Sequence, residues 1–450
     1  MTVEIIGTRN YSATVIRVPE LRKAQNSDRL YIIDKLGMTA IVDASWLDKV
    51  GELALIFPAE VQLSENYASR NNLYRHSELN VDHSQVGYLE DNRRVRALKL
   101  RGNISNALVL PLHSLNIGAD KFVLSCEASY FSEGDVFDTV DGVELCRKYV
   151  VETKSAGLTR GEQQVKKAFK RVDETFLPMH FETGQWEREK HNVAEGTELI
   201  ITQKLHGTSV RLANTVVKRQ LTWIEKIAQK LGIAVRDHDY DLVAGSRKVI
   251  KDPNNPRQDH YYKKDVYTEA LLEYGDVIPK NHVIYGELVG FVGDGEGAAK
   301  PLQAGHTYEA IADSPDPRKR TQLYVYRVAI VTEDGELIDL SWNQVKAFCV
   351  RHGLQNVPEL DRVAKSDFFV GDFTELDFWA DHQVDIARGF RGYAETPVKL
   401  SAGGTGKDEG VVIRDETGMV PVFYKLKNPS HFLYETAQLD TGEADMESQG

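Results

Sequence analysis

Short β-branched runs separated by turn residues follow one another through the first 150 residues of the chain. Gly, Asn, Asp or Pro stands between these runs, at the places where an extended chain must change direction. The clearest of them are TVEIIG, SATVIRV, RLYIIDKL, MTAIVDA and ELALIF. Many short strands joined by tight turns are typical of a small β-barrel with irregular additions. We therefore predict a barrel in this part of the chain.

The later part of the chain alternates strands with a few helices. ELIITQKL, VRLAN, HVIYGELVGFVG, LYVYRVAIV, EGVVIRD and VPVFYKLKN have the composition of strands. TWIEKIAQKLG places Trp223, Ile224, Ile227 and Leu231 on one helical face, and Gly232 can end that helix. SWNQVKAFCVRHG begins with the capping-box pair Ser341 and Gln344, and Gly353 can end it. The predicted class is α+β, dominated by antiparallel sheet.

A chain of 450 residues is too long for one ordinary core, so two domains are expected. We assign residues 1–150 to the β-barrel domain and residues 151–174, which are polar and contain Gly157 and Gly161, to a linker. Residues 175–430 form the second predicted domain, and residues 431–450 a C-terminal tail.

The net charge of −12 argues against a protein that binds nucleic acid by global charge alone. It leaves room for a local basic surface. The segment DNRRVRALKLR carries five cations, and these are candidate nucleic-acid contacts: Arg93, Arg94, Arg96, Lys99 and Arg101. An ordinary solvated surface is the alternative explanation of this segment.

No apolar run is long enough to span a membrane, and the first ten residues lack a signal-peptide pattern. The three cysteines, Cys126, Cys146 and Cys349, fit neither a disulfide framework nor a CxxC metal site. We expect buried thiols, no membrane partner and a cytoplasmic location.

The segment Gln203-Lys204-Leu205-His206-Gly207-Thr208-Ser209 carries the strongest indication of chemistry. A lysine that acts as a nucleophile must be an unprotonated amine, although its reference pKa is about 10.4. Neighbouring cations lower that pKa, and Lys425 and Lys427 lie on one face of a predicted strand where they are suited to this task. An ordinary hairpin and an exposed edge strand are the competing explanations of the two segments.

Four sequence motifs follow this lysine along the chain. They are YGELVG around Glu287, LYVYRV around Tyr326, DEGVVIR around Glu409, and YKLKN with Lys425 and Lys427. The ordered set resembles the covalent nucleotidyltransferase superfamily of ligases and capping enzymes. The signature of that superfamily begins Lys-x-Asp-Gly or, in many RNA ligases, Lys-x-His-Gly.

The resemblance implies that Lys204 forms a covalent lysyl-AMP with ATP, and that Lys425 and Lys427 assist at the α-phosphate. It implies that Glu409 and Glu287 hold Mg²⁺ or Mn²⁺. Tyr326 would stack on the base, and Arg247 would contact phosphate or the acceptor end. The implied nucleotide-binding set is Gln203, Lys204, His206, Gly207, Arg247, Glu287, Tyr326, Lys425 and Lys427.

Two positions depart from the pattern of the superfamily. Gln203 stands where many relatives have Glu, so an adenine contact there would differ in polarity. Tyr326-Arg327 stands where relatives often have Phe-Asp, so no role of an acidic residue is transferred to position 327.

Only 23 residues follow Lys427, which is too few for the OB barrel that DNA ligases and capping enzymes usually carry there. The order of domains resembles ATP-dependent RNA ligases in which an OB-like domain precedes a mainly antiparallel nucleotidyltransferase domain. This resemblance implies joining of 3′-OH and 5′-phosphate ends, in RNA or a nicked duplex, through lysyl-AMP and an AMP-capped polynucleotide, as in RNA repair. A DNA ligase, a capping-type enzyme, and a non-catalytic nucleic-acid-binding protein with a degenerate ligase fold are the alternatives.

Overall fold

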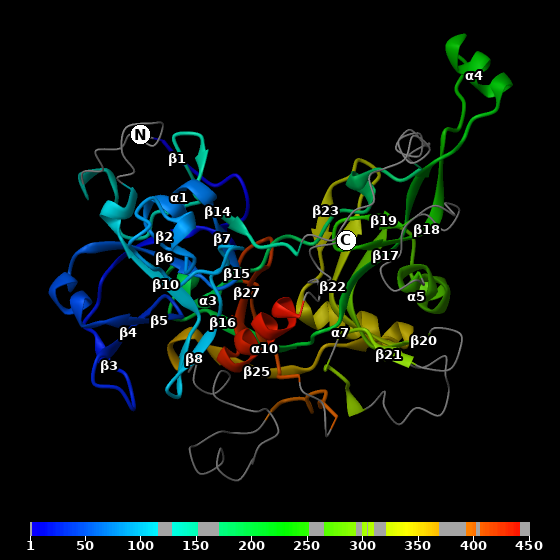
Figure 1. Ribbon diagram of the computed structural model, residues 1–450. Helices are drawn as coiled ribbons and strands as arrows, with labels where there is room; N and C mark the ends of the chain where they lie inside the picture. Colours follow the sequence, from blue (N-terminus) through cyan, green and yellow to red (C-terminus); the bar gives the residue numbers. More distant parts are fainter. Residues whose placement is uncertain are drawn as a thin grey trace. The chain divides into compact units, whose positions relative to one another are not determined.

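The computed structural model describes residues 2–115, 128–151, 171–251, 265–293, 299–303, 305–309, 321–368, 393–401 and 406–441. It contains two compact units, and each is assembled from separate stretches of the chain (Figure 1). Unit 1 comprises Met1–Val151, Gly184–Lys190 and Pro429–Ala444; unit 2 comprises Glu152–Thr183, His191–Asn428 and Asp445–Gly450. Most of the predicted linker, residues 152–170, lies outside the described residues.

Unit 1 contains several small antiparallel sheets. A four-stranded sheet has the order β10 (Ala107–Pro111), β6 (Leu53–Pro58), β2 (Ala13–Arg17), β11 (Val136–Phe137). The unit also contains four smaller groups. They are β3 (Arg22–Lys23) with β4 (Leu30–Lys35) and β5 (Met38–Asp43); β1 (Val3–Glu4) with β12 (Thr139–Val140) and β13 (Val143–Glu144); β7 (Val61–Leu63) with β14 (Cys146–Lys148); and β8 (Leu98–Leu100) with β9 (Asn103–Ser105). The five predicted runs all contain strands, but the described strands do not close into one barrel.

The four-stranded sheet of unit 1 is buried on both faces. Alternation along β2 sends Val15 into one apolar cluster and Ile16 into another, and β6 divides Leu55 and Ile56 in the same way. Because both faces pack against apolar side chains, this sheet is the centre of unit 1. The α-helices among the described residues of this unit are α1 (Glu65–Arg70), α3 (Trp186–Glu189) and α10 (Pro429–Asp440).

Helix α10 is tied to unit 1 by a buried polar network. The guanidinium of Arg94 is 1% exposed and lies 3.3 Å from a carboxylate oxygen of Glu60. The same guanidinium forms an ion pair with Asp440 of α10, and the hydroxyl of Thr436 donates to Glu60 at 2.8 Å. The backbone N–H of Ala97 donates to the Thr436 hydroxyl at 3.0 Å. The C-terminal helix therefore completes a unit that is otherwise built mainly from the first 151 residues.

Unit 2 contains two larger sheets. In the first, the neighbouring strands are β25 (Glu359–Ala364), β16 (Glu198–Lys204), β26 (Gly410–Asp415) and β27 (Val422–Lys427). In the second, the order is β19 (Ile250–Lys251), β18 (His238–Ser246), β17 (Thr208–Lys218), β20 (His282–Gly293), β22 (Thr321–Val331), β23 (Leu337–Asp339), with β21 (Ala299–Pro301) beside β20 and β24 (Gln355–Asn356) beside β22. Among these strands only β24 pairs in parallel, so the prediction of mainly antiparallel sheet is confirmed.

The segment around Lys204 is not a hairpin. Strand β16 ends at Lys204 and pairs with β25 and β26, whereas β17 begins at Thr208 and pairs with β18 and β20. Residues 205–207 therefore carry the chain from the first sheet to the second. The core of unit 2 contains side chains from both sheets, including Ile200 of β16 and Val210 of β17.

In the part of unit 2 that the structure describes, the α-helices are α4 (Trp223–Lys230), α5 (Val266–Tyr274) and α7 (Trp342–His352). Helix α7 has the predicted capping box of Ser341 and Gln344, and its C-cap Gly353 has a φ of 67°. Trp342, Val345, Phe348 and Cys349 of α7 are buried, so this helix covers the core as its periodicity requires.

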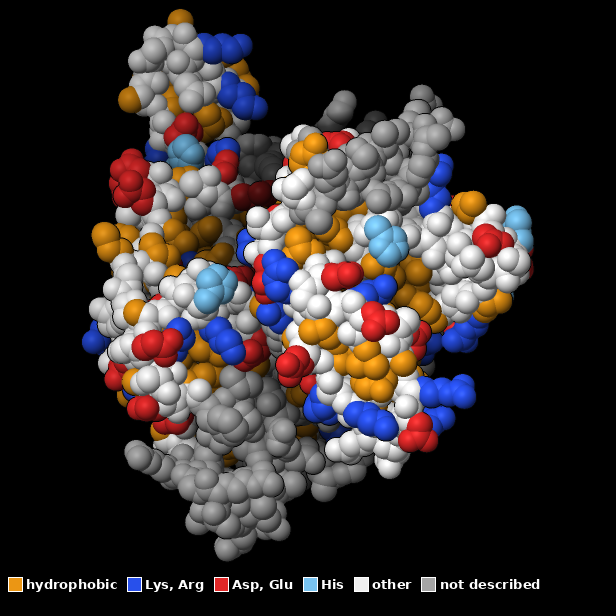
Figure 2. All heavy atoms as spheres, turned by 90° about the vertical axis from the view of Figure 1, so that its left-hand side faces the viewer, with side chains coloured by type: hydrophobic (Ala, Val, Ile, Leu, Met, Phe, Trp, Pro, Cys, Tyr) orange, Lys and Arg blue, Asp and Glu red, His pale blue; other side chains and the backbone are white. Residues whose placement is uncertain are grey.

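Helix α4 stands at the far end of the long β17–β18 hairpin, away from the sheet (Figure 1). Its predicted apolar face exists, but it is not buried: Trp223 is 72% exposed and Leu231 is 73% exposed. Figure 2 shows hydrophobic and basic side chains together on this projection, at the top of the view. A capping box of Thr222 and Glu225 stabilises the helix without help from a core.

Two cysteines lie within cores. Burial raises the pKa of the Cys146 thiol and of the Cys349 thiol to about 12 each. Because the reactive species is the thiolate, these two groups are inert, as predicted, and Cys126 lies outside the described residues. Among the residues that the structure describes, no helix is both long and apolar enough to cross a lipid bilayer.

Candidate active site

The register of three neighbouring strands brings two lysines to one row. Gly410 of β26 pairs with Lys204 of β16 on one side and with Lys427 of β27 on the other. Residues that occupy equivalent positions on adjacent strands point to the same face of a sheet. Lys425 is opposite Val412 and points to that face as well, while Leu426 is buried on the opposite face. The predicted lysines are therefore brought together.

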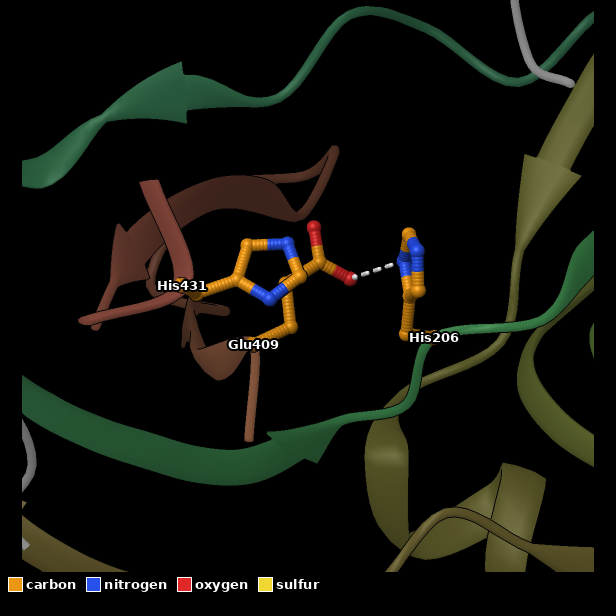
Figure 3. A group of neighbouring side chains, drawn as sticks. All are labelled: His206, Glu409 and His431. Carbon is orange, nitrogen blue, oxygen red and sulfur yellow. Dashed lines mark ion pairs between the residues drawn. The ribbon is translucent and has the colours of Figure 1, made fainter. Parts of the chain in front are cut away.

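Glu409 immediately precedes β26, and its carboxylate lies between the two lysines of this row. One of its carboxylate oxygens is 2.7 Å from Nζ of Lys204. The same oxygen is 3.3 Å from Nδ1 of His206 (Figure 3). The other is 3.6 Å from Nζ of Lys427. Figure 3 also draws His431, a buried residue of α10 in unit 1.

The carboxylate of Glu409 is held in its charged form although it is only 5% exposed. Burial alone would raise its pKa. The charges of Lys204 and Lys427, together with the hydrogen bond of His206, outweigh burial and hold that pKa well below its usual range. The site therefore contains a buried carboxylate anion next to two lysines and one histidine.

Two glycines allow the backbone to approach this closely. A Cβ atom at Gly207 would lie 2.0 Å from the carbonyl oxygen of Leu288, inside any permitted contact. Gly410 has a φ of +130°, and a Cβ there would lie 2.1 Å from the carbonyl oxygen of Leu426. Only glycine fits these two positions, which explains why glycine follows His206 and Glu409 in the sequence.

Glu287 reaches the same turn from the second sheet. It lies opposite Ser209 in the pairing of β17 with β20, and its side chain accepts a hydrogen bond from the N–H of Gly207 at 2.9 Å. The carboxylate is 9% exposed. The structure thus places Glu287 at the turn that follows the lysine, next to the row that contains Glu409.

Tyr326 also faces this region from the second sheet. Its hydroxyl is 3.0 Å from the hydroxyl of Ser209, which neighbours Glu287 across the strands. The ring of His180 meets the Tyr326 ring edge-on at 5.2 Å between centroids. Tyr326 is half-buried, so part of its side chain remains accessible.

Arg327, the second departure from the family pattern, points away from Tyr326 along its strand. It forms a two-bonded pair with the carboxylate of Asp339, at 2.5 and 3.0 Å. Its guanidinium also stacks over the rings of Phe181 and Tyr285, at 4.3 and 4.5 Å from their centroids. An arginine here belongs to the interior of unit 2, which agrees with the absence of a transferred acidic role.

The amide of Gln203 is committed to the backbone of Val398. It donates to the carbonyl of Val398 at 2.9 Å and accepts from the N–H of the same residue at 2.8 Å. The side chain is 2% exposed. We predicted a nucleotide contact for Gln203, and the structure instead shows a side chain that fixes residue 398. Arg247 lies half-buried in the turn after β18.

The predicted basic segment of unit 1 divides into buried and exposed members. Arg94 is buried in the network with Glu60 and Asp440, so in this structure its guanidinium is not presented to a ligand at the surface. Arg96 also pairs with Asp440, and Arg93 donates to the carbonyl of Leu63 at 3.0 Å. The hairpin of β8 (Leu98–Leu100) and β9 (Asn103–Ser105) exposes Lys99 and, at its turn, Arg101.

Sequence reasoning missed one segment that contacts the lysine turn. The hydroxyl of Tyr308 accepts a hydrogen bond from the N–H of His206 at 2.9 Å, and the amide of Gln303 donates to the carbonyl of Gly207 at 2.7 Å. The ring of His306 meets the ring of His206 edge-on at 4.5 Å. Burial raises the pKa of Tyr308 well above its usual value, so its hydroxyl stays neutral. No periodicity or motif marks these residues in the sequence.

The donor set around Glu409 suits a hard divalent cation. Carboxylate oxygens are the protein ligands that Mg²⁺ and Mn²⁺ prefer. Glu409 is buried, charged and compensated by amines rather than by a fixed arginine, so a cation can take over part of that compensation. The residues present therefore fit a metal at Glu409, and Glu287 offers a second carboxylate at the adjoining turn.

Comparison with known proteins identifies the family of the second unit. A model of the RNA ligase family matches residues 197–428, which is more than half of the chain. No curated protein sequence matches the chain significantly.

Solved structures of an RNA ligase from Naegleria gruberi share the fold over nearly the full length of both chains. The structure with pyrophosphate has a TM-score of 0.53 at 14% identity and covers 95% of this chain and 98% of its own. An unliganded variant has a TM-score of 0.54 at 13% identity, covering 96% and 100%. A variant with ATP and manganese has a TM-score of 0.52 at 12% identity, covering 97% and 99%.

Proposed function

This chain belongs to the RNA ligase family, and from that premise we propose that it joins 3′-hydroxyl and 5′-phosphate ends of RNA, with ATP as co-substrate. The single observation that carries the proposal is the row in which Lys204, Glu409 and Lys427 meet across three strands. A buried carboxylate paired with two amines contributes little to stability, because desolvation of the charges offsets their attraction. Stability alone therefore does not account for this arrangement.

The proposed reaction has three steps. The neutral amine of Lys204 attacks the α-phosphorus of ATP, a nitrogen–phosphorus bond forms, and the bond to the bridging oxygen breaks so that pyrophosphate leaves. AMP then passes from Lys204 to the 5′-phosphate end. A 3′-hydroxyl finally attacks that phosphate and releases AMP, which leaves a phosphodiester bond.

The side chains around Lys204 have separate tasks in the first step. Lys427 and Lys425 supply positive charge on the face from which the α-phosphate is attacked, where negative charge builds up during transfer. Glu409 stabilises the ammonium form of Lys204 while the two are 2.7 Å apart, so this contact must loosen before the amine attacks. Tyr326 offers a ring face for the base.

We extend the divalent cation to this chain on the fit of Glu409 and Glu287. Bound there, Mg²⁺ or Mn²⁺ would supply charge against the phosphate oxygens of ATP. The Naegleria enzyme has been solved with ATP and manganese, which supports this choice of ligands. Lys204 would then face a carboxylate whose charge is shared with the cation.

Unit 1 is proposed to hold the polynucleotide, through an OB-like arrangement of its sheets. Lys99 and Arg101 are exposed on the β8–β9 hairpin, and we retain them as phosphate contacts together with the partly exposed Arg93 and Arg96. Phosphate contacts fix the position of a strand without reading its sequence, which suits an enzyme that seals ends. Action in RNA repair in the cytoplasm is part of the same proposal.

The proposal is tested by incubating the purified protein with α-labelled ATP and magnesium or manganese. A label that survives denaturation is expected. Ligation of a panel of nicked duplexes, differing only in ribose or deoxyribose at the 3′-hydroxyl strand, then identifies the substrate. Absence of the covalent label with an intact fold would favour the non-catalytic alternative, and sealing of the deoxyribose nicks alone would favour a DNA ligase.

A further inference from the structure

The turn from Lys204 to Thr208 has backbone N–H and C=O groups that receive no hydrogen-bond partner from a neighbouring strand. Residues 205–207 cross from β16 to β17, so they stand outside both ladders. Three of their polar atoms are held by side chains instead: the N–H of His206 by Tyr308, the N–H of Gly207 by Glu287, and the carbonyl of Gly207 by Gln303. The position of the turn therefore depends on three side-chain contacts rather than on a strand partner.

Two of these three contacts come from one short stretch, residues 303 and 305–309, which we call the bracing segment. Tyr308 is 2% exposed and its hydroxyl reaches the N–H of His206 from within the core cluster of unit 2. Gln303 approaches the other side of the turn, at the carbonyl of Gly207. The segment thus forms hydrogen bonds with the turn at two successive residues.

The bracing segment also holds the stretch that leads into Glu409. The ring of His306 lies 2.8 Å from the carbonyl oxygen of Lys407, and the N–H of Gly406 donates to the carbonyl of Gly305 at 3.0 Å. The ring of His306 is in edge contact with that of His206 at the same time. One segment therefore connects the turn after the nucleophile with the approach to the carboxylate that faces it.

We propose that the bracing segment is a positioning device for adenylylation, in which Tyr308 and Gln303 fix the Lys204 turn against the Glu409 strand. Their hydrogen bonds go to the backbone of His206 and Gly207, so both residues act through that backbone. In-line attack on the α-phosphorus needs the amine at a fixed distance and angle, and a misplacement of about 1 Å can cost roughly a hundredfold in rate. The inference rests on the proposed function.

The reaction offers a way to separate positioning from general stability. A polynucleotide that already carries AMP on its 5′-phosphate needs no attack by Lys204, because its activation has been made beforehand. A defect in the placement of the lysine turn should therefore slow lysyl-AMP formation and leave the sealing of the pre-adenylylated strand intact. A defect in folding should lower both rates together.

Tyr308→Phe tests the inference by removing one hydroxyl from a buried ring. We expect the single-turnover rate of lysyl-AMP formation at saturating ATP to fall by about ten- to a hundredfold. The ATP concentration at half-maximal rate should stay unchanged, and so should the sealing rate of a pre-adenylylated strand. Tyr67→Phe is the matched control, because it removes a buried hydroxyl contact with Ser114 in unit 1.

Gln303→Glu provides a second variant of nearly equal volume. It turns the donor that faces the carbonyl of Gly207 into an acceptor, so the contact becomes repulsive and the same selective loss is expected. Wild-type rates in both variants would overturn the inference, and so would an equal loss in both reactions with a lowered Tm. A wild-type protein that forms no lysyl-AMP would instead refute the proposed function, which keeps the two failures distinct.

Discussion

Two buried carboxylates, Glu60 in unit 1 and Glu409 in unit 2, meet cationic side chains in different ways. Glu60 faces the guanidinium of Arg94, which is 1% exposed and is shared with Asp440, and it accepts a further bond from Thr436. Glu409 faces two lysines and a histidine whose side chains are 12–24% exposed.

The difference lies in the chemistry of the cations and in their access to solvent. An arginine keeps its proton at any ordinary pH and presents a planar fork, so the Glu60 network is closed and permanent. A lysine can lose its proton and then attack, and its ammonium can leave one anion for another. Burial and pairing alone therefore do not mark a reactive site; exchangeable partners do.

The largest expected effect is on Lys204. Lys204→Ala should abolish both lysyl-AMP formation and overall sealing, because it removes the amine that stands at the end of β16 opposite Gly410. Lys204→Arg is the sharper control: it keeps a positive charge beside Glu409 but offers no nucleophilic amine. Labelling with α-labelled ATP measures both. Appreciable lysyl-AMP in either variant would move the nucleophile elsewhere.

Changes at the partners of Lys204 come next. Glu409→Gln and Lys427→Ala should each lower lysyl-AMP formation by about a hundredfold or more, since the first removes the carboxylate proposed to hold the divalent cation and the second removes positive charge from the phosphate site. Both variants should remain folded, as circular dichroism and thermal unfolding can show. Normal reactivity with ATP in one of them would refute the assignment of that residue.

Substitutions in the Glu60 network of unit 1 should lower the stability of the protein and leave its reaction with ATP unchanged. Arg94→Ala leaves Glu60 buried without its cation and should cost about 3–5 kcal/mol in the free energy of unfolding. Lysyl-AMP formation by the folded fraction should not change. The double variant Arg94→Met with Glu60→Gln should recover much of the loss, because neither buried charge remains and Asp440 keeps its pair with Arg96. Denaturant titration measures these free energies, and an Arg94→Ala protein of wild-type stability would show that the network is not a structural tie.

A smaller effect is expected on the β8–β9 hairpin. Replacing Lys99 and Arg101 together by alanine should weaken binding of single-stranded RNA and lower the slope of log K against log salt by about 0.7 for each lost phosphate contact. Titration of a fluorescent oligonucleotide at several salt concentrations gives this slope. An unchanged slope would leave the hairpin as ordinary solvated surface, and lysyl-AMP formation serves as the control because it needs no polynucleotide.

The smallest expected effect is at Tyr326. Tyr326→Phe removes the contact with Ser209, worth about 1 kcal/mol, and should keep most activity because stacking needs only a ring face. Tyr326→Ala should weaken the use of ATP clearly. Equal damage from both changes would assign the function to the hydroxyl or to packing within the core. Steady-state kinetics over a range of ATP concentrations distinguishes these outcomes.

The sequence predicted which side chains meet in the candidate site but only part of what holds them there. The order of motifs located Lys204, Glu287, Glu409 and Lys427, because each belongs to a strand whose register is set by burial and alternation. Tyr308 and Gln303 act on backbone atoms of a distant turn, and such contacts leave no periodic signal.

Other predictions failed because local patterns do not report what a segment packs against. A run of arginines and lysines looks the same whether its members are solvated or buried, and Arg94 is buried because Glu60 and Asp440, far away in the sequence, supply charge. The apolar face of α4 has the spacing of a core helix, yet its residues are exposed. The sequence also left open an ordinary hairpin around Lys204, whereas the strands joined by His206-Gly207 belong to different sheets.

The position of α10 in unit 1 has a consequence for synthesis on the ribosome. Residues 1–151 are synthesised long before Thr436 and Asp440, which complete their polar network. Until then Arg94 and Glu60 lack two of their partners, so the nascent unit should remain open to chaperones and proteases. A chain cut short before α10 would keep this defect permanently, and cellular quality control could remove it before it ever handles RNA.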